Sequence, residues 1–362
     1  MPNPYCNRLQ ISYPAPRPSA TAKGQFLVTD ILDRDGAGFL IIGRAGMDLY
    51  ADPPGTTIET ATAFTAALGG SSANIAAGLC RQGMRAALVT CVSDDAVGRF
   101  CLAQLDAYGI DRRFVRAVGG EARNSLAVVE TRLQDTQSVI YRNGAADFEM
   151  RQEDVRALPY AAFQALVTTG TVLATEPSRS AALSAVELAK AVGLPVVFDV
   201  DYRPYTWASA EEAERVYSHA ATFCDIIVGN DEEFGFMAGD YDRGLPKARA
   251  LAAETARIVV YKMGERGAVT ITRDGEVRTG IFETGAIKPT GAGDAFMAGF
   301  LGGLAAGVPV AAAVERGSAA AAIVVSRVGC APAMPTADEL ARFMASHTLS
   351  PIQQVTDAHP AP

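Results

Sequence analysis

One aspartate follows two closely spaced glycines in the segment Thr290–Gly299, TGAGDAFMAG. Asp294 stands where a helix of small residues is predicted to begin, and a helix start offers unpaired N–H groups and a positive dipole end. Gly291 and Gly293 carry no side chain that would keep an anion away. These N–H groups could hold a phosphoryl group while Asp294 accepts the proton of an attacking hydroxyl. The segment therefore predicts phosphoryl transfer to an alcohol, with a capped turn before a buried helix as the alternative.

Two more polar side chains follow the ends of predicted strands or open a predicted helix. Asp48 comes after the first predicted strand, and its ionised carboxylate only accepts hydrogen bonds, which suits two sugar hydroxyls. Asn74 lies in a predicted helix that begins after Gly69 and Gly70, and its amide both donates and accepts. A turn-capping Asp48 and an exposed Asn74 behind a serine N-cap are the alternatives.

Two segments together resemble the signatures of a known family. Ile287–Gly299 resembles the C-terminal signature of the ribokinase-like (PfkB) carbohydrate kinases, and Leu68–Gly83, LGGSSANIAAGLCRQG, resembles their N-terminal signature. The resemblance covers roughly residues 39–347. It implies an α/β fold, a three-layer ribokinase-like sandwich with a mostly parallel central sheet and a small β-sheet lid. It also implies ATP and Mg²⁺ as cofactors and Asp294 as the base, with an anion hole made by Gly291, Ala292 and Gly293.

The resemblance assigns roles to residues outside this last segment as well. Asn230 and Glu233 match an NxxE element that orders Mg²⁺ through water, although Asn230 could instead cap a helix at 231–237. The turn KMGERG resembles the nucleotide side of the family's site, which implies contacts to ATP from Lys262, Gly264 and Gly267. The expected contacts to the sugar come from Asp48, Gly69, Gly70 and Asn74.

A sugar acid is the expected substrate. The segments 43–50, 141–147 and 199–207 are most similar to family members that phosphorylate 5-dehydro-2-deoxygluconate, with 2-keto-3-deoxygluconate kinases next. Arginine binds a carboxylate through two parallel hydrogen bonds. The sugar-acid kinases of the family use arginines at such strand ends, so Arg142 and Arg203 are the candidates, with a surface position as the alternative. The expected product is the 6-phosphate, formed in inositol catabolism.

Lys288 departs from the family pattern. Many members have an aspartate six residues before the catalytic one, in a segment that helps hold potassium where that ion is required. The ammonium group of Lys288 could replace the ion electrostatically, which predicts activity that does not depend on potassium.

Composition narrows the class of protein. The chain has 362 residues, 49% of them apolar, and a net charge of −8, which argues against nucleic-acid and membrane binding. Six cysteines without a CxxC pair and three dispersed histidines predict reduced thiols and no metal cluster. The sequence shows neither an 18-residue apolar run nor a signal peptide, so a cytoplasmic location is expected.

Predicted strands and helices alternate along most of the chain, which indicates a parallel sheet with right-handed crossovers. Strands are expected at 39–43, 86–92, 165–169, 195–200, 225–229, 257–262 and 268–272. Helices are expected near 72–82, 95–108, 179–192, 211–222 and 245–254, with two more after residue 294. Residues 1–38 are expected to be a poorly ordered extension and residues 348–362 a tail.

Segments 48–66 and 121–147 interrupt the alternation with short predicted strands. In the resembled family such segments form a lid over the sugar, where exclusion of water protects the phosphoryl group from hydrolysis. The alternative is a plain hairpin insertion. The sequence does not decide whether two copies of the chain form a homodimer through this lid.

The expected function is that of an ATP-dependent sugar-acid kinase, and the sequence leaves two alternatives to it. Another PfkB sugar kinase is the nearest alternative, and a non-catalytic sugar-binding regulatory protein on the same fold is the alternative from another class. The sequence has neither a GxxxxGK[ST] P-loop nor a GxGxxG after the first strand, so a nicotinamide oxidoreductase has no support.

Overall fold

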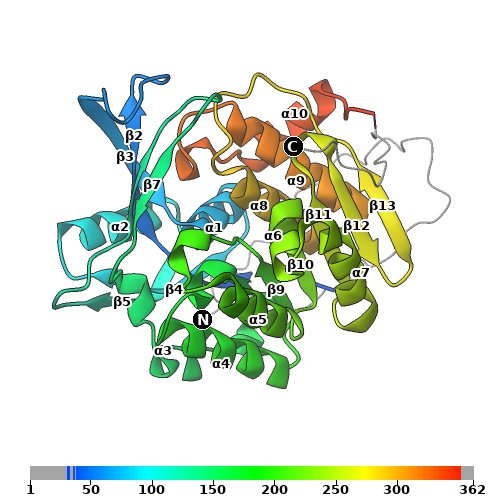
Figure 1. The fold of residues 1–362 in the computed structure, drawn as a ribbon, viewed down its shortest axis with the longest axis horizontal. Coiled ribbons are helices and arrows are strands. Elements are labelled where there is room, and N and C mark those ends of the chain that lie inside the picture. The colour runs from blue at the N-terminus through cyan, green and yellow to red at the C-terminus, as the bar shows by residue number, and fades with distance from the viewer. Residues whose placement is uncertain (1–30, 33–35, 37, 352–362) are drawn as a thin grey trace, which may run out of the picture.

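Nine strands form the main sheet of the computed structural model, which describes residues 31–32, 36 and 38–351. The strands lie in the order β13-β12-β11-β10-β9-β8-β1-β4-β5 (Figure 1). Their bounds are β1 Phe39–Ile42, β4 Ala86–Ser93, β5 Asp111–Val118, β8 Ala165–Thr169, β9 Val196–Asp199, β10 Ile226–Asn230, β11 Ile258–Lys262, β12 Ala268–Thr272 and β13 Gly275–Thr279. Only the β11–β12 and β12–β13 pairs are antiparallel. The sheet is therefore mostly parallel, as predicted.

Helices cover both faces of this sheet because its strands are apolar on both sides. Leu40 and Ile42 of β1 share a core with one set of helices, and Phe39 and Ile41 share a second core with the other. The first set is α3 Gln152–Arg156, α4 Ser178–Ala191, α5 Ala210–Ala221, α6 Asp231–Met237 and α7 Gly244–Glu254. The second set is α1 Ser71–Arg81, α2 Ala96–Ala107, α8 Ala292–Ala305 and α9 Val310–Val325, and α10 Ala337–Ser346 packs on α9. The result is the predicted three-layer sandwich.

The sequence missed elements whose residues are not continuously apolar. β5 alternates charged and half-buried residues, and β13 is short and polar, so neither has the apolar run by which the other seven strands were found. The expectation of two helices after residue 294 was wrong, because α10 follows α8 and α9. Its start has a reciprocal capping box between Thr336 and Glu339, a signal that the sequence does carry.

A second sheet of four strands projects beyond the main one (Figure 1). Its order is β3-β2-β6-β7, with β2 Gly46–Asp52, β3 Ala63–Gly69, β6 Leu126–Val129 and β7 Ser138–Tyr141. β3 leads through Gly70 directly into α1, so this sheet is joined to the main body at the start of that helix.

Most of the predicted N-terminal extension, residues 1–30, and most of the tail, residues 352–362, lie outside the described residues. At the C-terminal end, Leu349 pairs with Phe282, and Ser350 donates its N–H to the carbonyl of Ile281 at 2.7 Å. Among the helices that the structure describes, none combines the length and apolar character needed to span a membrane.

Candidate active site

A cavity of about 720 Å³ lies between the carboxyl ends of the main-sheet strands and the small sheet. Asp199, Asn230 and Lys262 reach it from β9, β10 and β11, and the starts of α1 and α8 complete its wall. Ala127 and Ile140 face it from the small sheet. The volume is in the range that a small organic ligand occupies.

The start of α8 brings the predicted base and anion hole together. Gly291 has a left-handed φ of 86°, and a Cβ there would lie 2.8 Å from the Cys330 sulfur, so the turn requires glycine. Asp294 lies in the first turn and accepts a hydrogen bond of 2.8 Å from the amide of Asn74. Burial and the nearby Asp201 raise the pKa of Asp294 to about 7, although Asn74 opposes the shift. A carboxyl group with this pKa can accept a proton near neutral pH.

The predicted sugar contacts come from β2, from the end of β3 and from the start of α1. A Cβ on Gly69 would lie only 1.8 Å from Oδ1 of Asp48, so this glycine leaves room for the carboxylate and does not itself line the cavity. Gly70 adopts a φ of 95°, and Asn74 is 3% exposed, so the alternative of an exposed Asn74 is wrong. Tyr50 donates its hydroxyl to Asp48 at 3.0 Å. Burial raises the pKa of Asp48.

The predicted metal-ordering pair forms the start of α6. Asn230 Oδ1 accepts the N–H of Glu233 at 2.8 Å, and Glu233 Oε2 accepts the N–H of Asn230 at 2.7 Å. This reciprocal capping box bears out the helix-cap alternative for Asn230. Both residues also line the cavity, so capping holds the amide and carboxylate there. Burial raises the pKa of Glu233 against the opposing charge of Lys262.

All three residues predicted for the nucleotide side line the cavity. Gly267 has a φ of 82°, and a Cβ there would lie 2.1 Å from the carbonyl oxygen of Thr279. The ammonium of Lys262 lies 5.6 Å from the centre of the Phe296 ring and 3.6 Å from where a Cβ of Gly293 would stand. A positive charge therefore flanks the anion hole. The three lining residues are Lys262, Gly264 and Gly267.

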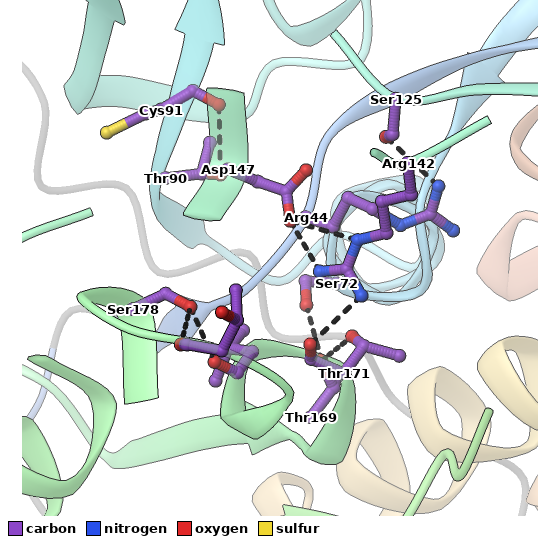
Figure 2. Close-up of polar contacts among 12 residues, drawn as sticks. Arg44, Ser72, Thr90, Cys91, Ser125, Arg142, Asp147, Thr169, Thr171 and Ser178 are labelled. Atoms are coloured by element: carbon purple, nitrogen blue, oxygen red, sulfur yellow. Dashed lines mark hydrogen bonds and ion pairs between the residues drawn. The ribbon is translucent and has the colours of Figure 1, made fainter. Parts of the chain in front are cut away.

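The two predicted carboxylate-binding arginines lie in different places. Arg203 lines the cavity and forms an ion pair of 2.6 Å with Asp201, whose pKa falls below its usual value despite burial. Arg142 is absent from the lining. Its Nε and Nη2 donate to Asp147, and its Nη1 donates to the carbonyl of Thr171 at 3.0 Å (Figure 2). The structure therefore gives Arg142 neither a surface position nor a place in the cavity, and its contact with substrate stays a prediction without structural support.

Sequence reasoning did not assign five charged residues of the cavity lining to the site, and two of them stand at strand ends; the five are Arg44, Asp199, Asp201, Asp231 and Glu232. Arg44 directly follows Gly43 at the end of β1, and Asp199 is the last residue of β9. The signal was available, because both stand at the carboxyl ends of parallel strands, the position that singled out Asp48. Burial holds the pKa of Asp199 well above its usual range.

Lys288 is fully buried beneath the anion-hole turn. It donates to the carbonyl of Thr290, one residue before Gly291. Burial lowers its pKa, while the charges of Cys330, Asp294 and Asp48 oppose the shift. The lysine therefore supports the turn from behind, outside the cavity lining.

Residues 38–337 match the pfkB family carbohydrate kinase. The chain belongs to this family. A 5-dehydro-2-deoxygluconokinase of Geobacillus thermodenitrificans is 39% identical over 311 residues, 84% of this chain and 92% of that protein. The protein of the same name from Photobacterium profundum is 38% identical over 311 residues, 84% of this chain and 94% of that one.

Solved structures agree with this assignment. A PfkB protein from Polaromonas sp. JS666 aligns with a TM-score of 0.71 and 29% identity, covering 82% of this chain and 98% of that one. An aminoimidazole riboside kinase from Salmonella enterica, complexed with aminoimidazole riboside and an ATP analog, aligns with a TM-score of 0.72 and 25% identity over 85% of this chain and all of that one. The expected family and ribokinase-like fold are confirmed, and the chain is an ATP-dependent carbohydrate kinase.

Proposed function

We propose that this kinase transfers the γ-phosphoryl group of ATP to the 6-hydroxyl of 5-dehydro-2-deoxygluconate, the step expected in inositol catabolism. The observation that carries the proposal is the arrangement of Asp294, with a pKa of about 7, beside the glycine turn in a cavity with two arginines. The name of the relatives at 38–39% identity supports a sugar acid as the substrate.

The residues divide the work of the transfer. Asp294 accepts the proton of the attacking hydroxyl, and the hydrogen bond from Asn74 fixes the direction in which its carboxylate points. The N–H groups of Gly291, Ala292 and Gly293, with the Lys262 ammonium nearby, stabilise the charge that develops on the transferred group. Asp48 accepts hydrogen bonds from sugar hydroxyls, and Arg203 holds the acid group.

The chain's own groups fit Mg²⁺ that is bound mainly through water. One carboxylate oxygen of Glu233 accepts the N–H of Asn230, and the other accepts the N–H of Tyr202 at 3.3 Å. Each oxygen keeps a lone pair that can accept a hydrogen bond from water. Within residues 38–351, no three acidic, histidine or cysteine side chains form a direct metal cage. When bound, the ion neutralises phosphate charge while retaining several waters.

A coupled ADP-release assay over sugar acids, neutral sugars and nucleosides tests the function. We expect 5-dehydro-2-deoxygluconate to give the highest kcat/KM and 2-keto-3-deoxygluconate to follow. A neutral sugar or nucleoside with a higher kcat/KM would contradict the proposal. Binding of the acid without ADP release would favour the sugar-binding regulatory protein.

We infer that the small sheet is a lid that also forms a homodimer. Asp48 and Tyr50 point to the inner side, so strand alternation puts Leu49 on the outer side, where Phe64 and Tyr141 are 40% and 61% exposed. This outer side is apolar across all four strands, which suits a second copy of the same sheet better than a charged partner. Light scattering should show a dimer that Tyr141→Lys dissociates. A monomeric wild type would contradict the inference.

A further inference from the structure

Arg44 is a buried cation for which the described residues supply no ion-pair partner. Its side chain is on the wall of the cavity, and the residue is only 8% exposed. Nη1 donates to Ser125 Oγ at 3.1 Å (Figure 2). Within the described part of the chain, Nε has no partner and no carboxylate is within ion-pair distance. An unpaired charge is expensive to remove from water, so this arrangement is costly until an anion binds.

The start of α1 lies against the same residue. The N–H of Ala73 donates to the backbone carbonyl of Arg44 at 3.2 Å, which fixes the loop to the first turn of the helix. No side chain caps this helix start, and its first turn has no acidic residue. Ser71, the first helical residue, is 5% exposed and lines the cavity, and its hydroxyl completes no hydrogen bond in residues 38–351. An uncapped helix start favours an anionic group.

We propose that Arg44 and Ser71, with the start of α1, bind the carboxylate of the substrate. The proposal rests on the proposed function and adds a residue pair that decides between a sugar acid and a neutral sugar. Nε of Arg44 donates to one carboxylate oxygen, and the Ser71 hydroxyl donates to the acid group as well. Arg203, which lines the same cavity and is already paired with Asp201, completes the subsite.

Three carboxyl groups of the chain also interact electrostatically with Arg44. They belong to Asp48, Asp201 and Asp294, and Arg44 lowers the pKa of each, though it pairs with none at short range. Ser71 is close enough to Asp201 to lower the pKa of that carboxyl without meeting hydrogen-bond geometry. A residue that only tuned these groups would change the pH profile with every substrate alike. A carboxylate-binding residue changes the selectivity between charged and uncharged substrates.

The test compares 5-dehydro-2-deoxygluconate with its uncharged methyl ester, which has the same 6-hydroxyl. The variants are Arg44→Met and Ser71→Ala, and Arg113→Gln, an exposed arginine on β5, is the control. We expect Arg44→Met to lower the ratio of kcat/KM for the acid to that for the ester by about tenfold or more, mainly through KM of the acid. Ser71→Ala should lower it by a smaller factor, and Arg113→Gln should leave it unchanged.

The proposed subsite would be contradicted if Arg44→Met lowered kcat/KM equally for acid and ester, or if the acid-to-ester ratio of kcat/KM were unchanged in both variants. If Arg44→Met does not fold, Arg44→Lys replaces it, because lysine keeps the charge but has no Nε. A lower acid-to-ester ratio of kcat/KM in both Arg44→Lys and Ser71→Ala then supports the subsite. Calorimetry of acid binding without ATP separates this inference from the proposed function. Acid binding that the wild type shows and Arg44→Met loses supports the subsite even where turnover is absent, and a wild type that does not bind the acid overturns both.

Discussion

Arg44 and Arg142 are almost equally buried, at 8% and 6% exposed, but their guanidinium groups have opposite surroundings (Figure 2). Arg142 is bonded to Asp147 and Thr171 and lies over the Phe148 ring at 4.1 Å, so the chain itself supplies its partners. Among the residues that the structure describes, Arg44 has one neutral partner, Ser125, and its Nε at the cavity is unpaired. Burial alone therefore does not identify a ligand-binding arginine, whereas a count of its partners does.

The same comparison applies to two carboxylates and gives the largest expected effect. Asp147 is paired with Arg142, whereas the hydrogen-bond partner of Asp294 among the described residues is the neutral amide of Asn74. Asp294→Asn keeps the shape but removes the proton acceptor, so kcat should fall by roughly 10²–10⁴ while ATP still binds. Steady-state kinetics and nucleotide binding measure the two quantities. Asp147→Asn is the control and should lose stability but keep kcat, and a kcat of Asp294→Asn within a few-fold of wild type would remove Asp294 from its role.

Substitution of each arginine by methionine should affect stability to different degrees. Arg142→Met leaves Asp147 buried without its cation, so the free energy of unfolding should drop by about 3–5 kcal/mol. Arg44→Met removes a charge that has no short-range ion pair but that favours the ionised form of three nearby carboxyl groups, so the free energy of unfolding should drop by less than in Arg142→Met. Denaturant titration of both variants provides the measurement. A larger loss in Arg44→Met than in Arg142→Met would reverse the comparison.

The pKa of Asp294 sets the expected dependence on pH. Burial and Asp201 raise it from 3.8 to about 7, and the carboxyl group must be ionised to accept a proton, so kcat should rise about tenfold between pH 6 and pH 8. Asn74→Ala removes a hydrogen bond that lowers this pKa, so its profile should move to higher pH. Because the folded state binds the proton more tightly, the contribution of Asp294 to stability should fall as pH rises from about 4 to about 7. A flat profile in the wild type would contradict this account.

Arg203 combines the two situations, since it is paired with Asp201 and also lines the cavity. Arg203→Lys keeps the charge but loses the planar pair of donors, so KM for the sugar acid should rise about tenfold or more. Initial rates with varied acid measure it, and KM for ATP is the internal control. An unchanged KM for the acid would assign Arg203 to Asp201 alone.

The sequence predicted well those parts of the molecule whose structure depends on residues close together in the chain. Seven strands of the main sheet were found because apolar runs buried on both faces are visible in the chain, and the TGAGD turn depends on backbone conformation at Gly291. The partners of Arg142 and Arg44 come from sequence separations of 5 to 81 residues, and only the folded chain shows which guanidinium is satisfied. Residue type at a strand end could therefore nominate an arginine but could not choose between these two.

Lys288 extends the comparison to a third buried cation, for which the smallest effect is expected. Like Arg142 it has a partner in the chain, the carbonyl of Thr290, and like Arg44 it lies near Asp294 and Asp48. A fixed ammonium at this position repels a monovalent cation and supplies its own charge behind the anion hole. Rates in sodium, potassium and a bulky organic cation should therefore agree at matched ionic strength, since screening acts equally in all three. Lys288→Asp should lose activity at low salt and regain part of it with potassium, because a carboxylate there attracts the ion. Several-fold activation of the wild type by potassium alone would show that backbone carbonyls still form an ion site beside the lysine.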